Sequence, residues 1–209
     1  FKLSRLLGNR FTSSRQSSST IAGILTTGGV EQNVNITRRQ TPSGEDVAIR
    51  LAGQPDALVW NDLEGAKATA SRVSEAQQTL IERVALDNPD QFVLAQLRGA
   101  SYYTIARDVR ADTSGSENYT GQLWDIVRID EPQSQAARSL SSNSRLYYIN
   151  SQTRLIDKIV SEIKGETIEA NIVQWTDQSG EKFPSHIVWK RGNETVQEFR
   201  LTSVSVQSQ

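Results

Sequence analysis

Few side chains in this sequence have the types and spacing that catalysis requires. His186 is the only histidine and the chain has no cysteine, which excludes multi-histidine metal sites, thiolate nucleophiles and cysteine-ligated zinc. His186 is not placed to activate Ser185 as a nucleophile, because successive strand residues point to opposite faces. The sequence also has no Gly-x-Ser-x-Gly motif. We therefore predict a binding protein and not an enzyme, with no cofactor and no metal.

Carboxylates and glycines occur without the patterns that would give them a chemical role. Asp125, Asp130 and Glu131 are close in sequence, but paired acid–base catalysis requires two carboxyl groups that converge in a cleft. We interpret them as parts of a solvated sheet face. The dipeptide Gly28-Gly29 lacks the spacing of a phosphate-binding loop and predicts a tight turn.

The charge balance argues against nucleic acid as a partner. Lysine and arginine total 23 against 24 aspartates and glutamates, and no run of basic residues offers a surface for phosphates. Apolar runs are only a few residues long, far short of the roughly 20 that a membrane-spanning helix needs, so we expect no transmembrane segment. Because the chain begins with Phe1 and contains no methionine, we expect that a signal peptide has been removed and that the protein is exported.

The first twenty residues read differently from the rest of the chain. Four apolar residues between Leu3 and Phe11 recur at helical spacing, which predicts a short amphipathic helix, and a serine-rich stretch follows up to Thr20. Its basic residues make a membrane-surface role an alternative to simple packing on the domain. We interpret residues 1–20 as a separate segment and residues 21–209 as a single domain.

Short apolar runs with period-two alternation, separated by turn residues, predict antiparallel strands from Ile21 onward. The predicted strands are residues 21–27, 30–39, 45–52, 58–61, 102–110, 122–130 and 145–150, followed by a meander over the last 55 residues. Near the end, the apolar phase shifts between Leu201 and Val204, which predicts a β-bulge at Thr202 or Ser203.

Two helices are predicted to interrupt the strands. Residues 71–86 place apolar side chains on one helical face, and residues 90–97 follow, with Pro89 near the start of the second helix and Gly99 after its end. The apolar residues of segment 154–164 fit a helical stripe at least as well as a strand, so periodicity alone leaves both structures open.

Two passages resemble the LolA-like family of periplasmic lipoprotein carriers and their relatives. Residues 147–156, Tyr-Tyr-Ile-Asn-Ser-Gln-Thr-Arg-Leu-Ile, are similar to a strand–turn–strand of that family, and residues 183–187, Phe-Pro-Ser-His-Ile, are similar to the start of one of its late strands. Residues 35–60 resemble its early strands, so the resemblance extends over about residues 21–207. It is a diffuse pattern without a catalytic motif.

The resemblance implies an α+β fold, in which a strongly curved, open antiparallel sheet of about ten strands forms a half-barrel and helices cover its concave face. It implies that residues 71–98 form a lid, that residues 155–163 form a strand, and that the protein is periplasmic or otherwise exported. Carriers of this family hold the lid through a basic residue near the cavity. No motif assigns that role to a particular arginine of this chain.

About ten strands present more apolar face than two helices can bury, so a cavity or a partner must cover the remainder. The resemblance implies an enclosed cavity that takes up acyl chains. For any single aromatic ring, packing in the core is favoured over lining a cavity. The cavity-lining candidates are Ile36, Ile49, Leu51, Trp60, Leu80, Val84, Phe92, Ile105, Trp124, Ile126, Tyr148, Ile172, Ile187, Trp189 and Phe199.

Our hypothesis is an exported lipid- or lipoprotein-binding carrier that holds acyl chains between the sheet and the lid. One alternative is a non-enzymatic sensor or protein-interaction module on the same fold, with a membrane-associated protein as partner. A second alternative is a hydrolase whose site the sequence does not reveal.

Overall fold

The computed structural model describes residues 17–41, 44–61, 65–68, 73–110, 122–132, 142–178 and 180–208. The amphipathic helix predicted over residues 2–11 lies outside these ranges. Within them, twelve strands form one antiparallel sheet. The strands are β1 (Ser17–Thr27), β2 (Val30–Thr41), β3 (Gly44–Leu51), β4 (Leu58–Asn61), β5 (Gly65–Ala68), β6 (Ser101–Arg110), β7 (Leu123–Asp130), β8 (Ser144–Asn150), β9 (Ile156–Ile163), β10 (Glu166–Gln178), β11 (Glu181–Arg191) and β12 (Glu194–Ser208).

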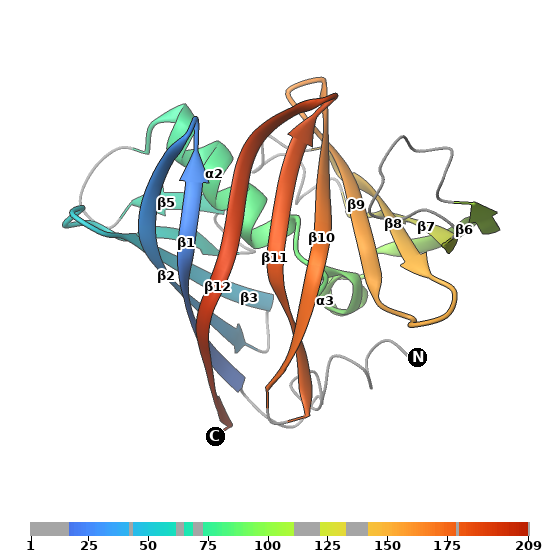
Figure 1. Cartoon of the computed structure of the whole chain (residues 1–209), viewed down its shortest axis with the longest axis horizontal. Helices are drawn as coiled ribbons and strands as arrows, with labels where there is room; N and C mark the ends of the chain where they lie inside the picture. The colour runs from blue at the N-terminus through green and yellow to red at the C-terminus, as the bar shows by residue number, and fades with distance from the viewer. Residues whose placement is uncertain are drawn as a thin grey trace.

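The strand order is β5-β4-β3-β2-β1-β12-β11-β10-β9-β8-β7-β6, so each strand pairs with its sequence neighbour except where β1 pairs with β12 (Figure 1). This pair joins the two ends of the described chain in the middle of the sheet. The sheet is open, with β5 and β6 as its edges. The curved antiparallel sheet predicted from the resemblance is confirmed, with more strands than the expected ten.

Local sequence accounts for the predicted hairpin and bulge. Gly28 and Gly29 both have positive φ, 57° and 79°, which a glycine pair tolerates and a tight β1–β2 turn requires. On β12, Ser203 pairs with Ala22 and Leu201 pairs with Gly23, which leaves Thr202 as the additional residue. The bulge predicted from the apolar phase shift is therefore confirmed.

Segment 154–164 is the strand β9 and not a helix. Ile156, Asp157, Lys158 and Ile159 are all buried, so both faces of this strand are covered. A strand covered on both faces has no need of alternation, which explains why periodicity could not distinguish it from a helix. The resemblance identified it correctly.

Two strands, β1 and β5, differ most from the sequence-based expectation. β1 begins at Ser17, within the serine-rich stretch that we had expected to precede the first strand at Ile21. β5, four residues long, was not predicted at all. Serine, alanine and glycine have weak strand preferences, so pairing with β12 and with β4 sets both elements.

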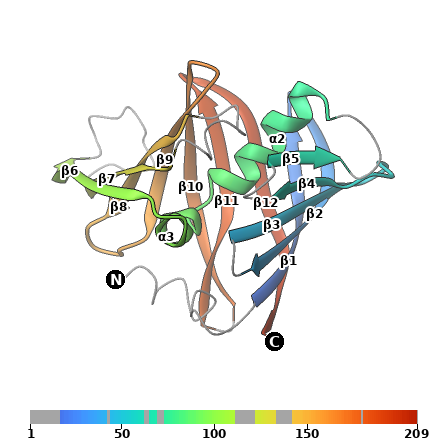
Figure 2. The same ribbon diagram turned by 180° about the vertical axis from the view of Figure 1, so that it is seen from behind.

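The helices α2 (Glu75–Leu86) and α3 (Gln91–Leu97) lie against one face of the sheet, which we call the inner face; the opposite face is the outer face. Ser74 caps α2 through a capping box with Gln77, so this helix begins four residues later than predicted. Figure 2 shows both helices in front of β10, β11 and β12. No described helix is long and apolar enough to cross a membrane.

Candidate ligand-binding site

An apolar crevice lies on the inner face where β1, β2, β11 and β12 meet the helical segment. Its walls are Ile21, Ile36, Arg38, Val84, Asn88, Asp90, Phe183, Pro184, Ile187, Trp189, Phe199 and Leu201. The free volume is about 30 Å³, which is room for about two water molecules. The crevice is therefore nearly closed in this structure.

The crevice brings together a minority of the predicted lining residues. Ile36, Val84, Ile187, Trp189 and Phe199 line it. Another group belongs to the surrounding core without lining the crevice: Ile49, Leu51, Trp60, Phe92 and Ile172 are buried there, and Leu80 is half-buried at its edge.

Trp124, Ile126 and Tyr148 are placed elsewhere, as a separate cluster on the outer face. Tyr147 contacts Phe92 on the inner face, with ring centroids 5.2 Å apart, and the next residue along the strand must point the other way. The three residues were assigned to the wrong face of the sheet, because apolar alternation does not say which face is which.

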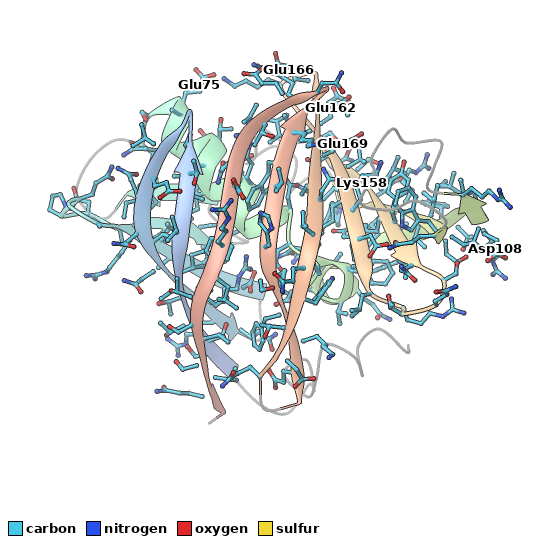
Figure 3. The ribbon with its side chains drawn as sticks, in the orientation of Figure 1. Glu75, Asp108, Lys158, Glu162, Glu166 and Glu169 are labelled. Carbon is cyan, nitrogen blue, oxygen red and sulfur yellow. The ribbon has the colours of Figure 1, made fainter. Side chains whose placement is uncertain are left out.

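Lys158 covers this outer aromatic cluster. Its Nζ lies 4.4 Å from the ring centre of Tyr148 and 5.2 Å from that of Trp124, and 3.8 Å from Glu169 Oε2 on the neighbouring strand. Figure 3 shows Lys158 and Glu169 side by side on β9 and β10. A cation over aromatic rings gives this cluster a stabilising role within the outer face.

Ile105 does not line a cavity either. It lies on the edge strand β6 and is 53% exposed. β6 has two register irregularities against β7, between Thr104 and Ala106 and between Ala106 and Val109. These bulges break the two-residue period on which the prediction relied.

Gly23 shapes one wall of the crevice, and the sequence pattern did not single it out. A Cβ atom placed on Gly23 would lie 2.4 Å from Phe199 Cε2 and 2.5 Å from the carbonyl oxygen of Arg200. Because Gly23 has no side chain, the Phe199 ring can pack directly against β1.

Arg38 fixes the helical segment to the sheet at the polar end of the crevice. Its Nη1 donates to both carboxylate oxygens of Glu45, at 3.1 and 2.9 Å, and its Nη2 donates to the carbonyl oxygen of Val84 on α2. Arg38 is 4% exposed and Glu45 is 2% exposed. The pair is thus a buried, charge-assisted contact between β2, β3 and the last turns of α2.

The same contact continues into α3. Gln91 Nε2 donates to Glu45 Oε2 at 2.8 Å and to the carbonyl oxygen of Ala85 at 3.0 Å, and Gln91 Oε1 accepts from Arg98 Nη2 at 2.7 Å. Arg98 Nε donates to Glu131 Oε2 at 3.0 Å. We call the series Arg38, Glu45, Gln91, Arg98 and Glu131 the latch, because it connects both helices to both halves of the sheet.

Sequence reasoning considered a basic residue near the cavity but assigned no particular arginine, and it took its site candidates from apolar residues alone. The signal was present in the alternation. Arg38 follows Val34 and Ile36 at period two, and Glu45 precedes Val47 and Ile49 in the same way. A charged residue in register with inward-pointing apolar residues indicates a buried polar contact.

Asp87, the C-cap residue of α2, adds a second polar contact beneath the helices. Its Oδ1 lies 3.6 Å from Arg145 Nε on β8. Burial raises the pKa of the Asp87 carboxyl above its usual value, because the desolvation outweighs the attraction of Arg145. Burial also raises the pKa of Tyr102, whose hydroxyl donates to the Phe92 carbonyl oxygen, to about 12.

Among the described residues, no group of three or more His, Cys, Asp or Glu side chains could hold a metal ion. No family model matches this chain, and no curated protein matches it. Solved structures are similar to it at low sequence identity.

A LolA superfamily protein from Nitrosomonas europaea has a TM-score of 0.59 and 8% identity, over 97% of this chain and 90% of that protein. A DUF1329 family protein from Desulfovibrio piger has a TM-score of 0.57 and 12% identity, over 97% and 90%. A putative outer membrane lipoprotein-sorting protein domain from Vibrio parahaemolyticus has a TM-score of 0.55 and 7% identity, over 99% and 91%. The chain therefore has a LolA-like fold, as the resemblance implied.

Proposed function

We propose that this protein binds an acyl chain of a lipid or lipoprotein in the inner-face crevice and carries it as a non-enzymatic binding protein outside the cytoplasm. The observation that carries the proposal is an apolar crevice closed by a helical segment that a buried arginine, Arg38, holds in place. The LolA-like fold is consistent with it, and the domain would comprise the sheet and both helices.

The small volume of the crevice implies that the helices move when a ligand enters. Ten buried methylene groups contribute on the order of 8 kcal/mol, at about 0.8 kcal/mol each. Moving the helices breaks the hydrogen bond from Arg38 to the Val84 carbonyl oxygen, which costs roughly 1.5–3 kcal/mol because the donor is charged. The free energy from burying the acyl chain therefore exceeds the cost of moving the helices. The difference is small enough for the ligand to be released again.

When the helical segment moves, one contact of the latch breaks and another stays. When the helical segment moves away, the Val84 carbonyl oxygen leaves Arg38 and water reaches the guanidinium. Arg38 keeps Glu45 as a partner on the sheet in both states, because both residues lie on neighbouring strands. The charge is therefore never left uncompensated.

The test is the binding of a fluorescent fatty acid to delipidated protein. Ile21→Gln places an amide in the crevice wall and is expected to weaken binding about tenfold, since losing about 1.4 kcal/mol of apolar contact corresponds to that factor. Val30→Gln is the matched control, because Val30 lies at the far end of the same hairpin and is 62% exposed.

Failure of the wild-type protein to bind the fatty acid would refute the proposal, as would equal binding by both variants. A stable complex with a membrane-associated protein, purified without lipid, would instead favour a sensor or interaction module.

A further inference from the structure

β11 and β12 separate at one end. They pair only from His186–Arg200 to Arg191–Glu194. Beyond His186, β11 continues to Glu181 beside β10, whereas beyond Arg200 β12 continues to Ser208 beside β1. The lower ends of β11 and β12 diverge in Figure 1, so the sheet has a fork between its two central strands.

A polar groove of about 510 Å³ occupies this fork. The volume falls in the range of small-molecule sites. Gln174, Thr176 and Gln178 line it from β10, and Thr202 and Ser203 line it from the bulged part of β12. None of the described residues that line the groove carries a carboxylate.

His186 and Arg200 form the closed end of the groove. Arg200 lies between Phe199 and Leu201, which both line the inner crevice, so its side chain points to the outer face. Glu198 Oε1 lies 2.6 Å from His186 Nε2 and 2.7 Å from Arg200 Nη2. Glu198 thus balances the charge of Arg200 and contacts the His186 ring at the same end of the groove.

The chemistry of this lining favours hydroxyl groups. Amides and hydroxyls both donate and accept hydrogen bonds, as each hydroxyl of a sugar or glycerol does. A phosphate accepts only, and Arg200, the one arginine or lysine of the described lining, is already paired with Glu198. The groove therefore suits an uncharged polyhydroxyl group better than an anion.

The groove and the inner crevice meet at the fork. Leu201 lines both, and Pro184 of the crevice directly precedes Ser185 of the groove. Since β11 and β12 are not paired here, a ligand that passes between them breaks no strand pairing. We infer that the fork groove binds the neutral polyhydroxyl head group of an amphiphile whose apolar chain lies in the crevice. This inference rests on the proposed function and adds a head-group class to it.

The experiment compares octyl glucoside, 1-octanol and free glucose as competitors of the fluorescent fatty acid. Octyl glucoside is expected to displace the probe at about tenfold lower concentration than octanol, because one or two net hydrogen bonds amount to that factor. In the double variant Gln174→Ala/Thr202→Ala this advantage should disappear while octanol binding stays unchanged. Both side chains are exposed, so the fold should tolerate their loss. Gln54→Ala, an exposed glutamine in the β3–β4 turn, is the matched control.

Three results of the competition experiment would each overturn a different part of the two proposals. Equal displacement by octyl glucoside and octanol would overturn the head-group assignment and leave the proposed function intact. Displacement by free glucose at the concentration of octyl glucoside would show that the octyl chain contributes nothing to binding, and would overturn the placement of that chain in the crevice. Absence of fatty-acid binding would overturn both proposals.

Discussion

Replacement of Arg38 by methionine tests whether the latch holds the helices on the sheet. Methionine fills a similar space without charge, so it removes both hydrogen bonds to Glu45 and the one to the Val84 carbonyl oxygen. Because Glu45 would keep its buried charge without the guanidinium, we expect the free energy of unfolding to fall by roughly 3–5 kcal/mol. Fatty-acid exchange should also become faster, because α2 loses its hydrogen bond to Arg38 on the sheet.

The assay is urea unfolding followed by the fluorescence of the four tryptophans. With a denaturant slope of about 2–3 kcal/mol per molar, the midpoint should shift by on the order of 1–2 M. The double variant Arg38→Met/Glu45→Leu should lose less than Arg38→Met alone, since it removes the buried carboxylate as well.

Arg154→Met is the control, because Arg154 pairs with Asp125 at 3.0 Å on a partly exposed surface and should cost less than about 1 kcal/mol. A loss in Arg38→Met no larger than in Arg154→Met would refute the idea that burial makes the latch strong.

Two further variants probe the crevice wall at Gly23 and the buried carboxyl group of Asp87 at the end of α2. Gly23→Ala should lower the free energy of unfolding by about 1–3 kcal/mol in thermal melts, because its methyl group would overlap Phe199 and a backbone carbonyl; an unchanged melting temperature would show that Phe199 moves freely. Asp87 has a raised pKa in the folded state, so its stabilising contribution is complete below the unfolded pKa near 3.8 and is lost as the pH rises through the folded pKa. The free energy of unfolding of the wild type should therefore decline relative to Asp87→Asn over that range in urea titrations at several pH values, and a constant difference would contradict the role of burial.

Alternation and turn residues were sufficient to predict most strands. Gly28-Gly29 and the phase shift at Thr202 are local signals, and the structure confirms both features. β9 was beyond this reasoning, because burial on both faces removes the period on which a strand is recognised.

The candidate site was only partly accessible from the sequence. Ile36, Ile187 and Phe199 were predicted because apolar strand residues usually face a core, and they line the crevice. Trp124 was assigned to the inner face because no sequence rule fixes which face an aromatic residue takes when Lys158 can cover it on the other. The fork groove depends on where β11 and β12 cease to pair, and that register is a property of the whole sheet.

The pairing of β1 with β12 affects the order in which this chain folds. Ser17 and Ser208 are partners on the two central strands, so β1, the first of the described strands to be synthesised, must wait for β12, the last of them. Until then two separate meanders expose the edges that later join, and contacts between such distant residues form slowly. We expect that molecules truncated before β12 leave β1 as an unprotected edge and aggregate, which gives chaperones a defined interval in which to act.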